Sequence, residues 1–121
     1  MPVACGDAGE LLRLADLAGF RVFHLDAALM PDKKTLLEQM AQRLGFPGDF
    51  GKNWDAAIDY LSDLHSFHGG GKFLIIVEHA AQLQKNDPKL YGDFIKVLEL
   101  GAGRTTEAFK DAVTLRIAVV D

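Results

Sequence analysis

Apolar residues along the chain form two kinds of pattern: short apolar runs and repeats at helical spacing. The order of these patterns along the chain predicts the order of strands and helices. Three short apolar runs have the length and composition of strands; they cover residues 20–25, 72–78 and 114–120. The segments between these runs repeat their apolar residues at helical spacing. They predict helices over residues 7–18, 33–44, 54–64, 79–85, 89–100 and 105–112.

Polar and flexible residues at the ends of these segments support the same boundaries. A short polar side chain directly before each of three predicted helices can accept a hydrogen bond from a free backbone N–H. These residues are Asp32, Asn53 and Asp87. Pro88 fits the first turn of the helix that follows. Gly101 and Gly103 predict a break between the last two helices.

Strands that are separated by helices imply a parallel sheet, because parallel strands need crossover connections. We therefore expect an α/β fold in which a small three-stranded parallel sheet is packed with helices. The length of 121 residues fits a single domain over residues 1–121. A domain of this size buries roughly two-thirds of its unfolded surface, so it folds without a disulfide or a metal.

Composition and charge exclude several classes of protein. Cys5 is the only cysteine, so an internal disulfide is impossible and a cytoplasmic location is expected. The longest strongly apolar run, residues 73–77, is far shorter than the roughly 20 residues of a membrane helix, and the first residues do not resemble a signal peptide. The net charge of −4 disfavours direct binding to nucleic acid.

The predicted helix over residues 54–64 is the most informative segment. At 100° per residue its apolar side chains fall on one side, and three carboxylates fall nearly opposite. The carboxylates are Asp55, Asp59 and Asp63. Like charges at this spacing repel by about 0.2–0.5 kcal/mol per pair, so helix stability alone does not favour the row. The pattern fits either a solvated face or a binding site for a basic partner or a metal.

The sequence gives weaker support for other kinds of functional site. His65 and His68 could bind zinc, but no cysteine or third histidine stands near them in the sequence. The run over residues 69–72 differs from a phosphate-binding loop because it precedes a strand and lacks the final Ser or Thr. Asp55 and Asp59 could act as the acid–base pair of a glycosidase, but adjacent turns of an exposed helix supply no enclosed cleft. We therefore expect neither an enzyme nor a cofactor.

The segment over residues 46–61 resembles the barstar family, the intracellular inhibitors of the secreted ribonuclease barnase. The family's pattern is a proline, one or two aromatic residues, Gly-x-Asn, an apolar residue, Asp-Ala, and a second Asp four residues on. The residues that match it are Pro47, Phe50, Gly51, Asn53, Trp54, Asp55, Ala56 and Asp59. The order of elements over residues 20–121 is also similar, so residues 1–19 look like an added N-terminal helix.

The resemblance implies an inhibitor that is a monomer when free and blocks the active site of a basic, barnase-type ribonuclease. Its acidic helix would mimic RNA phosphate: Asp59 would take the place of the phosphate, and Asp55 would make a second charged contact. Gly51 and Asn53 would shape the preceding loop and form hydrogen bonds across the interface. The implied interface comprises Asp49, Phe50, Gly51, Asn53, Trp54, Asp55, Ile58, Asp59, Asp63 and Glu99.

Two residues depart from the family's pattern. Asp49 stands where the family often has a tyrosine, and Ile58 stands where it has a tryptophan. Because aromatic anchors contribute strongly to interfaces, we expect a partner that is more basic or differently shaped than barnase. Glu99 is the nearest counterpart of a glutamate that the family uses late in its last helix.

An alternative to the ribonuclease inhibitor is an acidic interaction module for a basic partner that is not a nuclease.

Overall fold

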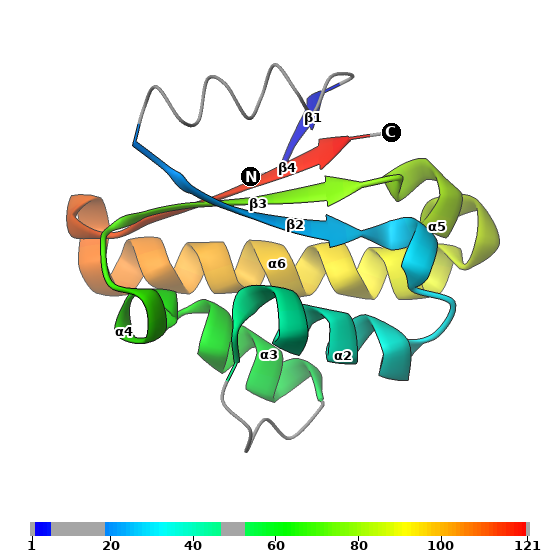
Figure 1. Ribbon diagram of the computed structural model, residues 1–121, viewed down its shortest axis with the longest axis horizontal. Helices are drawn as coiled ribbons and strands as arrows, with labels where there is room; N and C mark the ends of the chain where they lie inside the picture. Colours follow the sequence, from blue (N-terminus) through cyan, green and yellow to red (C-terminus); the bar gives the residue numbers. More distant parts are fainter. Residues whose placement is uncertain (1, 6–18, 47–52, 121) are drawn as a thin grey trace.

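Three of the strands confirm the predicted parallel sheet (Figure 1). The computed structural model describes residues 2–5, 19–46 and 53–120. Strands β2 (Arg21–Asp26), β3 (Lys72–Glu78) and β4 (Thr114–Val120) match the three predicted runs and pair in parallel. Helical segments separate them along the chain. The predicted α/β fold with a small parallel sheet is therefore confirmed.

A fourth strand extends this sheet beyond the prediction. Strand β1 (Pro2–Cys5) pairs in parallel with β4, so the order of the sheet is β1-β4-β3-β2. Its four residues do not alternate between apolar and polar side chains, and the sequence pattern did not predict it. The predicted helix over residues 7–18 lies outside the described residues.

Helices cover one face of the sheet. Figure 1 shows α2, α3, α4 and α6 on the same side of the strands, and α5 beyond the carboxyl ends of β2 and β3. The bounds are α2 Lys33–Leu44, α3 Trp54–Leu61, α4 Leu64–His68, α5 Ala80–Asn86 and α6 Pro88–Phe109, with short 3₁₀ helices η1 (Ala27–Leu29) and η2 (Lys110–Ala112). The predicted helices over residues 33–44 and 79–85 are confirmed as α2 and α5.

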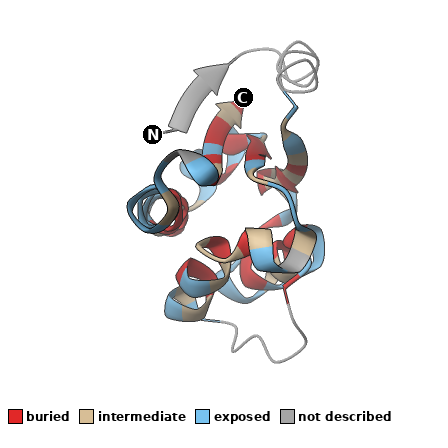
Figure 2. Ribbon diagram, turned by 90° about the vertical axis from the view of Figure 1, so that its left-hand side faces the viewer, coloured by how far each residue is buried: buried red, intermediate tan, exposed pale blue. Residues whose placement is uncertain are grey.

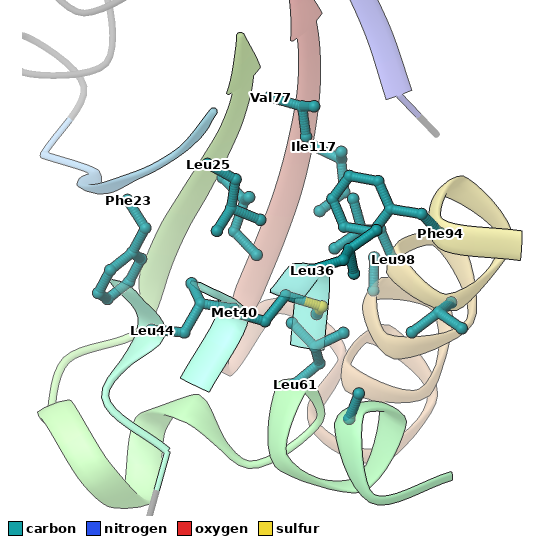
Figure 3. Packing of buried hydrophobic residues seen from close by; sticks show 14 of the residues in the cluster. Phe23, Leu25, Leu36, Met40, Leu44, Leu61, Val77, Phe94, Leu98 and Ile117 are labelled. Carbon is teal, nitrogen blue, oxygen red and sulfur yellow. The ribbon is translucent and has the colours of Figure 1, made fainter. Parts of the chain in front are cut away.

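The main core lies between the sheet and these helices. A row of apolar side chains crosses the sheet, because Phe23, Ile75 and Ile117 are aligned on neighbouring strands. Phe94 of α6 and Leu36 of α2 pack against this inner face and are fully buried (Figure 3). Figure 2 shows the same arrangement, with buried residues on the facing sides of helices and strands. Each such side chain contributes about 1.5–3 kcal/mol on burial.

Strand β3 is buried on both faces. Its residues Leu74 and Ile76 point away from the main core and form a second apolar cluster with Ala118 and Val120 of β4. A strand with two buried faces needs a continuous apolar run rather than an alternating one. This explains why β3 has the clearest strand signal in the sequence.

Helix α2 is capped at both ends. The backbone N–H of Thr35 donates to Asp32 Oδ1 at 2.8 Å, and this hydrogen bond holds the pKa of the Asp32 carboxyl below its usual value. At the other end Gly45 adopts a left-handed conformation with φ of 69°, which glycine adopts without steric cost. Both ends therefore agree with the boundaries that the sequence predicted.

The predicted break in the last helical segment is wrong, because α6 continues through both glycines. Gly101 is buried against α3: a Cβ atom placed there would lie 2.6 Å from the Cβ atom of Leu61. Glycine costs about 1 kcal/mol relative to alanine inside a helix. The cost is offset here because the missing side chain lets two helices approach closely. Gly103 faces open space.

We predict opposite effects for two alanine substitutions in α6. Gly101→Ala should lower the free energy of unfolding by about 1–2 kcal/mol, because overpacking against Leu61 outweighs the better helix propensity of alanine. Gly103→Ala should raise it by about 0.5–1 kcal/mol, because its added methyl group meets no other atom. Urea denaturation of both variants measures the difference. Equal effects of the two substitutions would contradict the packing role of Gly101.

Candidate functional site

Helix α3 begins at the residue that the sequence predicted. Asn53 has an extended backbone, and its Oδ1 accepts a hydrogen bond from the backbone N–H of Ala56 at 2.8 Å. Asp55 stands in the first turn, where its negative charge is favourable next to the positive end of the helix dipole. The cap and the first-turn carboxylate therefore fix the start of the acidic helix.

The inner side of α3 is part of the main core. Ala57 and Leu61 are almost completely buried, and Tyr60 packs its ring on Phe46 with 5.4 Å between the ring centroids. Ile58 is only 8% exposed. Ile58, which the resemblance includes in the interface, thus lies on the core side of α3 and supports the helix from there. Burial of this face holds the opposite face in a fixed position.

The outer side of α3 carries two carboxylates one turn apart. Asp55 and Asp59 are both exposed, as the helical spacing predicted. Their side chains point away from the core because the buried residues of α3 lie on the other side of the helix. This exposed pair is the centre of the candidate site.

Asp63 does not extend this pair, because α3 ends earlier than predicted. The Ser62 hydroxyl donates to the carbonyl of Ile58 at 2.8 Å at the end of the helix, and a new helix, α4, begins at Leu64. Asp63 lies between the two helices, and its Oδ1 accepts a hydrogen bond from the Ser66 hydroxyl at 2.8 Å. The predicted single row of three carboxylates over residues 54–64 is therefore wrong.

An arginine of α6 is paired with the central carboxylate. Arg104 Nη1 donates to Asp59 Oδ1 at 2.8 Å, and the two side chains are 57% and 70% exposed. An exposed ion pair of this kind contributes at most about 1 kcal/mol to stability. Arg104 is absent from the predicted site because it is 45 residues from Asp59 and because the predicted break separated it from the rest of α6.

Trp54 lies at the edge of the site and is half-buried. Lys33 Nζ is 5.4 Å from the centre of its ring, a distance at which the cation is attracted to the ring face. A hollow of about 240 Å³ adjoins the indole; it is lined by Asp32, Lys33, Trp54, Asp87, Lys89, Leu90 and Asp93. The indole ring of Trp54 therefore remains partly open to solvent.

Four further residues of the predicted interface lie outside α3. Asp49, Phe50 and Gly51 lie outside the described residues. Glu99 is exposed on α6, five positions before Arg104. Five positions correspond to a rotation of about 140° around the helix axis. Because Arg104 points toward α3, Glu99 lies on a different side of α6 from the carboxylates of α3.

The two histidines that were considered for zinc take part in aromatic packing and hydrogen bonding. The ring of His65 meets Phe109 edge-on with 4.3 Å between the centroids. His68 Nε2 is 2.6 Å from the carbonyl oxygen of Leu44, to which it donates. Within the described ranges, no three potential metal ligands come together. In the same ranges, no helix is both long and apolar enough to cross a membrane.

The fold and the site together define a small α/β protein that presents an exposed acidic helix. Comparison with known protein families gives this class a name. Residues 20–118 match the model of the family described as Barstar (barnase inhibitor). The match covers most of the chain, so the chain belongs to the barstar family. It begins at residue 20, where the sequence analysis placed the start of the family core. No curated protein matches the chain.

We predict that Asn53→Ala destabilises the protein by about 1 kcal/mol, because the N–H of Ala56 loses its acceptor at the start of α3. Asn53→Asp is the matched control: its carboxylate keeps an oxygen in place for the cap, so the free energy of unfolding should stay within a few tenths of a kcal/mol of wild type. Thermal and urea unfolding measure both variants. If Asn53→Ala were as stable as wild type, the cap would not fix the acidic helix.

Proposed function

We propose that this protein inhibits a basic ribonuclease of the barnase type by placing the outer face of α3 in its active-site cleft. The observation that carries the proposal is the exposed pair Asp55 and Asp59, which lies within the family motif on a helix fixed by the core. Members of the barstar family are inhibitors rather than enzymes, and we extend that role to this chain.

The chemistry of the two carboxylates suits such a cleft. A ribonuclease binds the phosphates of RNA with cationic side chains, and a carboxylate forms short, charge-assisted hydrogen bonds with the same groups. Asp59 would occupy the position of a phosphate. The fixed backbone of α3 supports this role, because a side chain on an ordered helix loses less freedom on binding than one on a loop.

The charge of the protein supports rapid association with a basic partner. The net charge of −4 attracts a cationic surface at a distance, and the exposed carboxylates of α3 direct it to one face. Such attraction weakens as salt shortens the range of electrostatic interactions. Inhibition that depends strongly on salt is therefore part of the proposal.

We predict that Asp59→Ala abolishes stoichiometric inhibition of a barnase-type ribonuclease. Loss of a central charged contact should weaken binding by more than about 2 kcal/mol, or roughly 30-fold. The measurement is RNA cleavage at low salt with equimolar amounts of inhibitor. Unfolding curves should stay close to those of wild type, because Asp59 is exposed.

Glu38→Ala provides a control for the lost charge. Glu38 is exposed on α2 and lines a separate hollow with Leu29 and Gln42. Its removal should leave inhibition within about twofold of wild type, because it acts only through screened, long-range attraction. If Asp59→Ala inhibited the ribonuclease as well as wild type does, the proposed mechanism would be wrong. Binding to the ribonuclease without inhibition would instead favour an acidic interaction module.

A further inference from the structure

The carboxylate at the centre of the proposed docking surface already has an internal cationic partner. Asp59 Oδ1 is bound by Arg104 Nη1 at 2.8 Å, while both side chains remain largely open to solvent. A partner that approaches α3 therefore meets an ion pair at Asp59 and a second carboxylate at Asp55. The surface is mixed in charge rather than uniformly acidic.

The packing of α6 on α3 places the guanidinium there. Gly101 allows the backbone of α6 to approach Leu61, and Arg104 follows three residues later on the flank of α6 that faces α3. Leu100, one turn before Arg104, is a large apolar side chain that is 45% exposed. Asp55, Asp59, Leu100 and Arg104 thus combine acidic, apolar and basic groups on adjoining helices.

A uniformly cationic surface fits this arrangement poorly. Its cations would have to displace Arg104 from Asp59 or come to rest beside it. The exposed pair itself is easily broken in water. Once a partner excludes water, however, an unpaired guanidinium beside other cations is strongly unfavourable. A partner that also carries a carboxylate opposite Arg104 removes this cost, since every charge then has a counterpart.

We infer that Arg104 is a specificity-determining residue, which selects partners that bring a cation to Asp59 and a carboxylate to Arg104. The inference rests on the proposed function only in that both place the docking surface on α3. It adds that the charge pattern of the partner, and not its net positive charge alone, decides binding.

Two peptides with equal arginine content test this inference without the ribonuclease. One is hexaarginine, and the other alternates arginine with aspartate. Each is titrated at about 0.1 M salt into wild type, Arg104→Gln and Lys96→Gln, with the amide NMR signals of Asp55 and Asp59 as the reporters. Glutamine keeps most of the length of both side chains, and Arg104 and Lys96 are exposed, so both variants should fold like wild type.

Lys96→Gln removes the same charge from the same helix as a matched control. Lys96 is eight positions before Arg104, which corresponds to about 12 Å along the axis. This separation exceeds the screening length of about 10 Å at the chosen salt concentration. A change that appears in Arg104→Gln alone therefore reports on the pair with Asp59.

We expect Arg104→Gln to bind hexaarginine about two- to fivefold more tightly than wild type, and to bind the alternating peptide more weakly than wild type does. Lys96→Gln should change both affinities by less than about 1.5-fold. Unchanged or tighter binding of the alternating peptide by Arg104→Gln would overturn the inference, since Arg104 would then act only through its charge. Weaker binding of hexaarginine by Arg104→Gln would also overturn it, because Arg104 would then only position Asp59.

A second comparison separates this inference from the proposed function. Wild type and Arg104→Gln are assayed as inhibitors of a barnase-type ribonuclease with a uniformly cationic cleft. Arg104→Gln should inhibit at least about twofold more tightly. If neither form inhibits the ribonuclease, the proposed function fails for that enzyme, while the peptide titrations still decide the role of Arg104.

Discussion

Close contact between α6 and α3 positions everything that the proposed function uses. Leu61 packs directly on the backbone of α6 because Gly101 has no side chain. This contact sets the distance between the two helices and, with it, the reach of Arg104 to Asp59. Helix α6 is in turn held by the buried side chains of Phe94 and Leu98 against the inner face of the sheet. The core thus positions the site through α6 as well as through the buried side of α3.

The two sides of α3 make very different contributions to the free energy of folding. Burial of Ile58 and Leu61 contributes about 1.5–3 kcal/mol for each side chain. Repulsion between Asp55 and Asp59 costs only about 0.2–0.5 kcal/mol and is reduced further by Arg104. The acidic outer face therefore lowers the free energy of unfolding only slightly. Stability does not require the two carboxylates, which agrees with a role in binding.

The sequence predicted those elements whose signals are local. The buried run of β3, the caps Asp32 and Asn53, and the spacing of Asp55 and Asp59 depend on residues that are close together in the chain, and all were confirmed. The family motif lies in the same short segment, and a family model matches the chain over residues 20–118.

The errors arose where distant residues decide the structure. A glycine inside a helical pattern predicts a break unless a neighbouring helix fills the space, and Leu61 is far from Gly101 in the chain. The helical pattern of α3 continues to Leu64, so the turn at Ser62 was not visible in the spacing. Strand β1 depends on pairing with the last strand of the chain. The ion pair of Arg104 joins positions that no local pattern connects.

The most direct test of the proposed docking surface is an NMR map of the complex with a barnase-type ribonuclease. Amide signals of the protein are compared with and without one equivalent of the nuclease. We predict the largest changes over α3 from Asn53 to Leu61 and at Arg104 on the adjoining flank of α6, with little change at β2 and α5. Changes that are concentrated on β2 and α5, with α3 unaffected, would contradict the prediction.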